Sequence, residues 1–317
     1  MPKASSRFRG AISAIPLLIA AAVIAPPALA QTATTVELVP GSEVTSLPGV
    51  AFDQGLADKL PAAIRSTGAL KIVTTAYTPP IAYFGPDNKE IIGVDADIAK
   101  ALGVLFGLKI EMTDIAAFPA LIPALKAKRF DLAISGANDT PALEKQVDVV
   151  DYMYDGKTIM VQRGNPQHIT AMADLCGKKV AVSVGSLQEQ MVQAQSAKCA
   201  TPIDIVSIPK QPDVLVAVRT GRVDATVNGY ATSIYTTKHQ LQNGVGLDAL
   251  PDVRLAVGYL GMLTNKDDSQ LRDAVAAGLQ TLVTSGAYAQ IMQKWGLDPL
   301  AIKDVKINDG INIPINF

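Results

Sequence analysis

The sequence predicts a two-lobed α/β chain in which each lobe is a mainly parallel sheet flanked by helices and two hinge strands join the lobes. The chain has 317 residues, which is enough for two domains of ordinary size. Apolar residues make up 49% of it and aromatic residues only 5%, which favours aliphatic strands covered by helices over an aromatic-rich sandwich. Strand-like and helix-like segments alternate, which is typical of parallel sheets with right-handed crossovers.

An export signal peptide is expected over residues 1–30. Lys3, Arg7 and Arg9 precede a short apolar run, and Ala28-Leu29-Ala30 then forms a small-x-small cleavage site. The alternative is a transmembrane helix, but the run falls short of the ~20 apolar residues that a span needs. Cleavage would take the formal net charge from −1 to −4. No cysteine follows that would carry a lipid anchor, so we expect a freely soluble periplasmic protein.

An extension and two lobes are expected after the signal peptide. Residues 31–55 lack periodicity, which predicts a flexible N-terminal extension. Lobe 1 is expected over residues 56–160 and 256–317, and lobe 2 over residues 161–255. Strands are expected at residues 70–74, 109–112, 130–135, 158–162, 179–184, 203–208, 223–227 and 255–263. Helices are expected at residues 56–61, 92–107, 119–128, 141–146, 186–197, 212–220, 233–240, 269–284 and 288–294.

The hinge follows from this order of elements. The C-terminal helices are needed to complete the core of lobe 1. The chain is therefore expected to leave lobe 1 near Lys157–Arg163 and to return near Arg254–Met262. Two strands that cross between lobes form a hinge, and closure of such a hinge around a ligand is a common use of this architecture.

The two cysteines and two histidines limit the chemistry. Cys176 and Cys199 are the only cysteines, and in an oxidising compartment a disulfide is favoured over two buried thiols. His168 and His239 are the only histidines and have no metal-ligand spacing, so we expect neither a metal nor another cofactor. A formal net charge of −1 offers no basic face, so nucleic acid is not an expected partner.

Several short motifs occur in a characteristic order. They are Gly93-Val94-Asp95-Ala96-Asp97, Asp174-Leu175-Cys176-Gly177-Lys178, Gly221-Arg222-Val223-Asp224-Ala225 and Lys294-Trp295-Gly296. Over about residues 60–296 the chain resembles the polar amino-acid type, family 3, of ABC-transporter periplasmic substrate-binding proteins. The resemblance implies the two-lobed periplasmic binding protein type II fold. It also implies that a monomer captures a small molecule between its lobes and delivers it to an ABC permease in the inner membrane.

The candidate ligand contacts lie after strands, because ligands in open parallel sheets bind beyond the carboxyl ends of the strands. For Ser186, which opens a helix, the alternative is an ordinary helix N-cap. For each aromatic residue the alternative is packing in the core. The candidates for hydrogen bonding are Thr75, Ser135, Asn138, Ser186 and Asn228, and those for stacking are Tyr77, Tyr83, Phe118 and Tyr230.

Two positions depart from the pattern of the family. Leu143 stands where the resemblance implies an arginine on the ligand's α-carboxylate, and Gly229 where it implies an aspartate on the α-ammonium. Each hydrogen bond to a charged group is worth about 1.5–3 kcal/mol, so both losses are large. We therefore expect a small ligand without a free zwitterion, such as an amide, a ring compound or a modified amine. The open alternative is an α-amino acid in a new pose, with Arg163 or Lys145 supplying charge.

Two other functions remain open from the sequence. An enzyme on the same scaffold, such as a dehydratase, would need a positioned acid or base, and we identify no paired carboxylates, Ser-His-Asp set or Cys-His pair. We therefore expect a binding protein rather than an enzyme. The second alternative is a sensor whose closed form docks on a membrane receptor.

Overall fold

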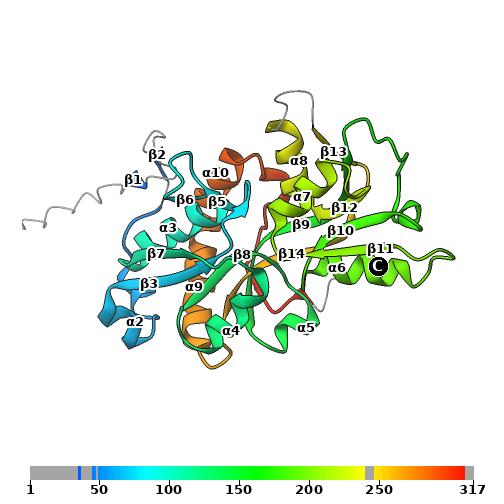
Figure 1. Ribbon diagram of the computed structural model, residues 1–317. Coiled ribbons are helices and arrows are strands. Elements are labelled where there is room, and N and C mark those ends of the chain that lie inside the picture. Colours follow the sequence, from blue (N-terminus) through cyan, green and yellow to red (C-terminus); the bar gives the residue numbers. More distant parts are fainter. Residues whose placement is uncertain (1–34, 37–44, 48, 240–245, 311–317) are drawn as a thin grey trace, which may run out of the picture. The chain divides into compact units, whose positions relative to one another are not determined.

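One ten-stranded sheet organises the part of the chain that the computed structural model describes, which is residues 35–36, 45–47, 49–239 and 246–310 (Figure 1). Its strand order is β11-β10-β12-β9-β14-β8-β3-β7, and β13 and β15 also pair with β9. The expected signal peptide, residues 1–30, lies outside the described residues. Smaller sheets are formed by β1-β2 and by β4-β5-β6.

The helices and strands follow the expected order. The strands are β1 Thr35–Val36, β2 Thr45–Ser46, β3 Ala69–Thr74, β4 Tyr77–Thr78, β5 Ala82–Phe84, β6 Ile91–Ile92, β7 Lys109–Asp114, β8 Leu132–Asn138, β9 Asp148–Gln162, β10 Lys179–Ser183, β11 Asp204–Ile208, β12 Ala225–Gly229, β13 Leu247–Ala249, β14 Leu255–Thr264 and β15 Lys306–Ile307. The helices are α1 Gln54–Ala57, α2 Ala62–Thr67, α3 Val94–Phe106, α4 Leu121–Lys126, α5 Pro141–Glu144, α6 Leu187–Ser196, α7 Gln211–Arg219, α8 Tyr230–His239, α9 Ser269–Ser285 and α10 Ala287–Lys294, with 3₁₀ turns η1 Phe118–Ala120, η2 Met172–Leu175 and η3 Asp298–Leu300.

The sheet is parallel towards its two ends and antiparallel in the middle. β3 pairs in parallel with β7 and β8, and β10 pairs in parallel with β11 and β12. Between these two groups, β9 and β14 run antiparallel to each other, and they pair antiparallel with β12 and β8 respectively. The chain therefore has the expected α/β fold, in which two mainly parallel groups of strands are joined by two crossing strands.

β9 is longer than the sequence predicts. It begins at Asp148 rather than at Thr158 and has 15 residues. Its first part carries Asp148, Asp151 and Asp155, which resemble loop residues in the sequence but are buried here. The pairing with β14 runs from Asp148 opposite Thr264 to Lys157 opposite Leu255. Long-range pairing, which a local pattern does not reveal, sets the start of this strand.

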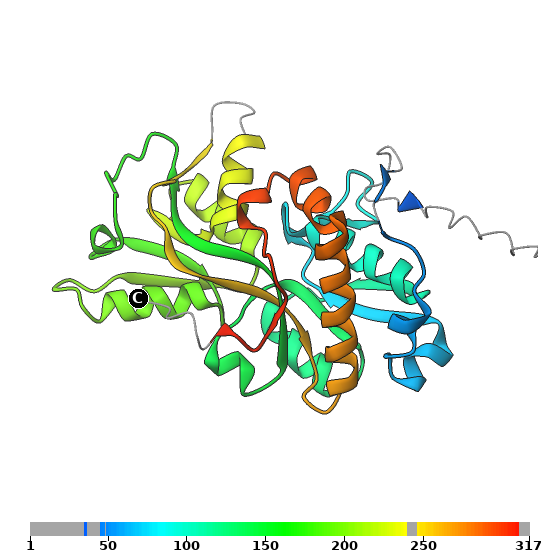
Figure 2. The same ribbon diagram turned by 180° about the vertical axis from the view of Figure 1, so that it is seen from behind.

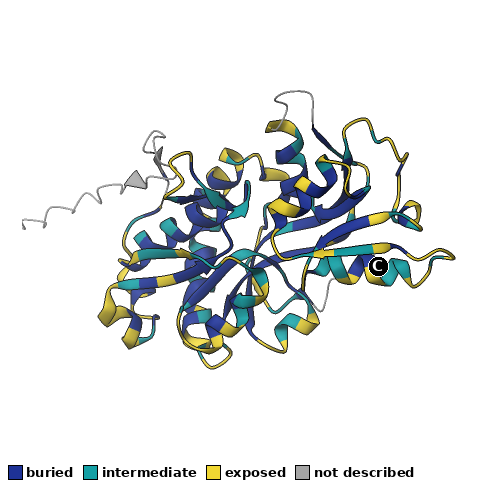
Figure 3. Ribbon diagram, viewed as in Figure 1, coloured by how far each residue is buried: buried dark blue, intermediate teal, exposed yellow. Residues whose placement is uncertain are grey.

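Separate apolar clusters lie at the two ends of the sheet. Figure 3 shows that much of the sheet is buried, in dark blue, on both sides of the crossing strands. One cluster contains Leu102 of α3, Leu279 of α9 and Tyr288 of α10, so the C-terminal helices complete the first core as expected. Figure 2 shows α9, in orange, which packs against α3 and β9. Leu47 and Val50, the last part of the expected extension, are buried in this same core. The second cluster includes residues of β10, α6 and β12.

Gly93 brings a loop close to the start of α3. Its φ is +129°, and a Cβ placed on it would lie 2.3 Å from the carbonyl oxygen of Ile81. The amides of Val94 and Asp95 donate to the carbonyl oxygens of Pro80 and Ile81 at 3.0 and 3.1 Å. Residues 91–92 form β6, so the helix starts at Val94 instead of at the expected residue 92. Gly93 thus allows the Pro80–Ile81 backbone to lie on the helix N-terminus.

Replacing Gly93 by alanine should therefore destabilise the fold strongly. We expect Gly93→Ala to lower the free energy of unfolding by more than about 3 kcal/mol, because the new methyl group clashes with backbone and the φ is unfavourable. The matched control is Gly68→Ala, where φ is +67° but no atom lies within 4 Å, and the expected loss is about 1 kcal/mol. Urea unfolding of both variants measures the difference. Equal losses would show that the close approach to Ile81 contributes nothing.

A cluster of buried carboxyl groups lies beside the middle of β9. Asp139 follows β8 and accepts a hydrogen bond from the Gly310 amide at 2.9 Å, while Asp151 on β9 is fully buried. Burial, together with the nearby charge of Asp139 and of Asp309, raises the pKa of Asp151 to about 9. Burial and the charge of Glu144 also raise the pKa of Asp139. The pair therefore holds at least one proton at neutral pH.

This protonation makes stability depend on pH. The folded-state pKa of Asp151 lies above its ordinary value of 3.8, so the unfolded chain loses the proton first and stability falls as pH rises from about 4 to about 9. Asp151→Asn mimics the protonated group. We expect the excess of the variant's unfolding free energy over that of the parent to grow by up to about 4 kcal/mol between pH 5 and pH 8, at about 1.4 kcal/mol per pH unit. Denaturation at both pH values, with the exposed Asp213→Asn as control, measures this. A difference in unfolding free energy between variant and parent that is the same at both pH values would contradict the raised pKa of Asp151.

Candidate ligand-binding site

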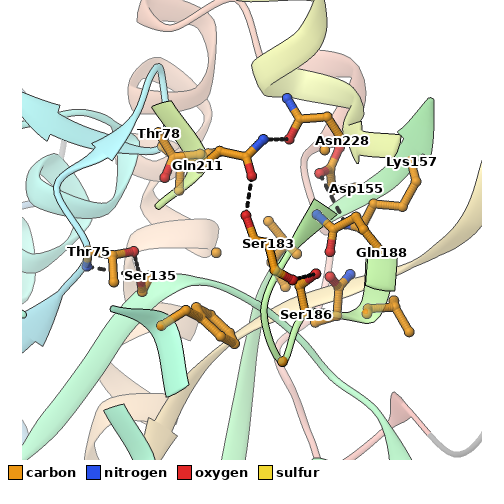
Figure 4. Close-up of a pocket in the computed structure, with 18 of the residues that line it drawn as sticks. Thr75, Thr78, Ser135, Asp155, Lys157, Ser183, Ser186, Gln188, Gln211 and Asn228 are labelled. Carbon is orange, nitrogen blue, oxygen red and sulfur yellow. Dashed lines mark hydrogen bonds and ion pairs between the residues drawn. The ribbon is translucent and has the colours of Figure 1, made fainter. Parts of the chain in front are cut away.

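A cavity of about 240 Å³ lies where the parallel strands end at their carboxyl ends (Figure 4). One group of lining residues follows or ends β3 and β8 and includes Thr75, Ser135 and Asn138. A second group lies at the ends of β10 and β12 and includes Ser183 and Asn228. Crossing strand β9 also contributes to the lining. The cavity is thus at the edge where open parallel sheets hold ligands.

The structure brings most of the expected contacts to this cavity. The candidates that line it are Thr75, Tyr77, Phe118, Ser135, Asn138, Leu143, Ser186 and Asn228. Tyr83 and Tyr230 do not line it. The Tyr83 ring packs edge-on against Trp295, and its hydroxyl lies 3.3 Å from that of Tyr235. The Tyr230 ring lies 3.6 Å below the guanidinium carbon of Arg254. That the lining residues touch a ligand stays a prediction.

Hydroxyl groups on the first side of the cavity are bonded to each other. The Thr75 amide donates to Ser135 Oγ at 3.0 Å, and the two hydroxyl oxygens lie 2.6 Å apart. Beside them, burial is the main cause that raises the pKa of the Tyr77 hydroxyl, so it stays protonated and can donate. This side therefore offers neutral hydrogen-bonding groups together with the ring of Phe118.

A chain of side-chain hydrogen bonds crosses the second side. Ser183 donates to Gln211 Oε1, and Gln211 Nε2 donates to Asn228 Oδ1 at 2.8 Å (Figure 4). Asn228 Nδ2 in turn donates to Met160 Sδ at 3.4 Å. These contacts fix the amide of Asn228, which is 2% exposed. Sequence reasoning missed Gln211. Pro212 in the first turn of a helix that follows β11 was the available signal, because it places Gln211 at a strand's carboxyl end.

Ser186 is the N-cap of α6. Its hydroxyl accepts from the Glu189 amide at 3.2 Å and donates to the Ser183 carbonyl oxygen at 2.6 Å. The Gly185 amide donates to the Glu189 carboxylate at 2.7 Å, so the carboxylate already occupies one of the free amides before the helix. Ser186 thus has the capping role that the sequence offered as the alternative to ligand binding. Its hydroxyl both donates and accepts a hydrogen bond within the protein.

Removal of this hydroxyl should cost stability. We expect Ser186→Ala to lower the unfolding free energy by about 1 kcal/mol, because the Glu189 amide loses its acceptor. Ser186→Thr keeps a capping oxygen and should recover most of that loss. Thermal unfolding of the three proteins measures it. A threonine variant as unstable as the alanine variant would show that the cap is not the cause.

Asp155 and Lys157 bring a buried ion pair to the cavity. Their side chains are 5% and 3% exposed, and Lys157 Nζ lies 3.8 Å from Asp155 Oδ2. The other oxygen, Asp155 Oδ1, accepts from the Ala231 amide at 3.1 Å. Burial raises the pKa of Asp155 against the lowering effect of Lys157 and Arg254, and burial lowers the pKa of Lys157 against the effect of Asp155. Within the described part of the chain, these two are the only charged residues that line the cavity.

Leu143 and Gly229, where the resemblance implied charged residues, both line this cavity. Leu143 lies on α5, packs beside the apolar cluster of Leu121 and Leu125, and carries no charge into the lining. A Cβ placed on Gly229 would lie 3.2 Å from Asp155 Oδ2. The carboxylate of Asp155 therefore fills the space beside Gly229. Sequence reasoning missed Asp155 because it did not recognise the first part of β9 as a strand.

Away from the cavity, the expected disulfide is formed between Cys176 and Cys199. The described residues contain no group of His, Cys, Asp and Glu side chains that is arranged to hold a metal ion. They also contain no helix long and apolar enough to cross a membrane.

A family model agrees with this fold. The model of the bacterial extracellular solute-binding proteins, family 3, matches residues 70–298, which is most of the chain. The chain belongs to this family.

Several known proteins are similar to this family 3 chain. ABC transporter arginine-binding protein 1 of Escherichia coli K12 is 28% identical over 70% of this chain and 88% of its own length. The arginine-binding extracellular protein ArtP of Bacillus subtilis 168 is 30% identical over 72% of this chain and 87% of its own. A structure of an ancestral arginine-binding protein with arginine bound has a TM-score of 0.66, at 29% identity over 72% of this chain and 98% of its own. An ancestral amino acid-binding protein described as a precursor of cyclohexadienyl dehydratase has a TM-score of 0.65, at 30% identity over 74% and 97%.

Proposed function

We propose that this chain is exported to the periplasm, captures a small polar molecule between two lobes and delivers it to an ABC permease in the inner membrane. The cavity supports this, because its lining comes from both parallel groups of strands and from β9, which joins them. Ligand binding would favour a closed arrangement that the permease recognises. We propose that the lobes have the boundaries expected from the sequence and that the protein acts as a monomer.

We further propose that the ligand is not a free zwitterionic α-amino acid. The observation that carries this proposal is the charge of the lining. Only Asp155 and Lys157 are charged among the described lining residues, and they pair with each other. Leu143 and Gly229 offer no charge to an α-carboxylate or an α-ammonium. Burying such groups without partners costs several kcal/mol each. The arginine-binding proteins to which the chain is similar take a ligand with one more positive charge, for which this lining has no free carboxylate.

The positions of Arg163 and Lys145 bear on the competing pose for an α-amino acid. Neither residue lines the cavity. The Arg163 guanidinium packs against Gly246, and Lys145 is exposed at the end of α5. Their positions therefore support a ligand without a zwitterion.

Catalysis and sensing are the alternatives to transport. Two observations bear on catalysis. One similar protein is described as an ancestral precursor of a dehydratase, and Asp155 and Lys157 place an acid and a base in the cavity. We propose binding without turnover, because these two groups are engaged with each other. Recovery of a bound compound unchanged after long incubation tests this. Sensing would instead require that the closed form binds a membrane receptor.

A ligand screen tests the proposed function. The mature protein is refolded to remove carried-over ligand and heated with the standard L-amino acids, amides, amines, nucleobases and small ring compounds. A true ligand in about 100-fold excess over Kd should raise the free energy of unfolding by about 2.7 kcal/mol. We expect non-zwitterionic compounds to raise the melting temperature. Strong stabilisation by arginine or another plain α-amino acid would contradict the proposed ligand class, and no stabilisation by any compound would contradict solute capture itself.

A further inference from the structure

The ion pair of Asp155 and Lys157 is unusual in being buried without a direct hydrogen bond between its members. Their atoms are 3.8 Å apart, which is longer than a hydrogen bond. At this distance the contact with Asp155 does not satisfy any of the three N–H groups of the Lys157 ammonium. Both residues line the cavity, and Figure 4 shows them on the same side of it. The cavity wall thus holds a buried donor that a bound ligand can reach.

The carboxylate beside this donor is held in place from behind. Asp155 Oδ1 is bonded to the Ala231 amide, which leaves Oδ2 towards Lys157. The absence of a side chain at Gly229 makes room for Oδ2. Asp155 and Lys157 are two residues apart on one strand, so their side chains project to the same face. A donor and an acceptor therefore stand next to each other at a fixed spacing.

We propose that Asp155 and Lys157 act as one ligand-binding unit for a neutral group that carries a hydrogen-bond acceptor next to a donor, such as a carboxamide. Lys157 donates to the ligand's carbonyl oxygen, and the ligand's N–H donates to Asp155 Oδ2. This inference rests on the proposed solute-binding function and names the chemical class of its ligand.

Charge balance gives the unit its selectivity. A carboxamide leaves the ion pair intact and supplies the hydrogen bonds that the pair lacks. A ligand with a single positive charge competes with Lys157 for Asp155, and a ligand with a single negative charge competes with Asp155 for Lys157. Either one leaves a buried charge without its partner, which is strongly unfavourable. The pair should therefore reject both kinds of ion.

The test compares three probes that share one ring. They are benzamide, benzoate and benzylammonium, and their Kd values are measured by titration calorimetry or NMR at up to millimolar concentration. We expect the parent protein to bind benzamide at least about tenfold more tightly than either ion. Lys157→Met leaves a lone carboxylate, so the preference should shift towards benzylammonium. Asp155→Asn leaves a lone ammonium, so the preference should shift towards benzoate.

Opposite shifts in preference are the readout, because general damage to the fold weakens all three probes together. The matched controls are Lys59→Met and Asp252→Asn, which remove the same charges from exposed positions outside the cavity and should keep the parent's order of preference. If Lys157→Met fails to fold, Lys157→Gln keeps a donor of similar length and should show a smaller shift in the same direction.

Two results would contradict this inference alone, and a third would also contradict the proposed function. If benzoate or benzylammonium binds the parent most tightly, or if both variants change all probes alike, the pair is not the recognition unit, while solute binding stands. Suppose instead that benzamide does not bind but an α-amino acid does, and that the Kd of the amino acid is unchanged in both variants. The inference then fails, while solute binding stands. If no compound of either panel binds the parent, the proposed function fails with it.

Discussion

The antiparallel pairing of β9 with β14 is the constraint on which this structure depends. These two strands connect the parallel groups β3-β7-β8 and β10-β11-β12, and β9 also pairs with β12, β13 and β15. A shift of one residue in this register would turn every side chain of β9 to the other face. The register therefore decides that Asp155 and Lys157 face the cavity. It also fixes where Asp151 meets Asp139.

Much of the fold follows from the sequence because aliphatic strands and amphipathic helices alternate along most of the chain. The strands at residues 69–74, 179–183 and 204–208 lie within two residues of their expected limits. The first part of β9 was not predicted from the sequence, because buried carboxyl groups such as Asp151 look like loop residues when only local composition is considered. Their burial depends on partners far away in the chain, such as Gly310, whose amide bonds to Asp139. The small sheet β4-β5-β6 was missed for another reason. Its strands have only two or three residues, which is too short for a recognisable alternation of apolar and polar residues.

Some residues of the site can likewise be predicted from local sequence patterns, whereas the position of others depends on strand pairing. The direction of the parallel strands was sufficient to predict that Thr75, Ser135 and Asn228 lie at one edge of the sheet, where they line the cavity. Tyr83 was expected beside them as well, but it belongs to β5 and its ring packs on Trp295, which follows α10. A stretch of sequence cannot show which of two available surfaces an aromatic ring will cover. Lys157 could be found only once the length and the register of β9 were known.

The uncharged residues at positions 143 and 229 are physically consistent with the ion pair on β9. An arginine at position 143 and an aspartate at position 229 would place opposite charges on α5 and β12, in different parts of the cavity wall, which suits a ligand whose own charges are separated. This chain has neither, and its charges lie together on β9 instead. Both arrangements have no net charge, so the difference is one of spacing. A buried ion pair contributes little to stability, since desolvation offsets most of the attraction. Its presence at a cavity wall therefore supports the proposed role in recognition, since two opposite charges 3.8 Å apart suit a ligand whose acceptor and donor are neighbours.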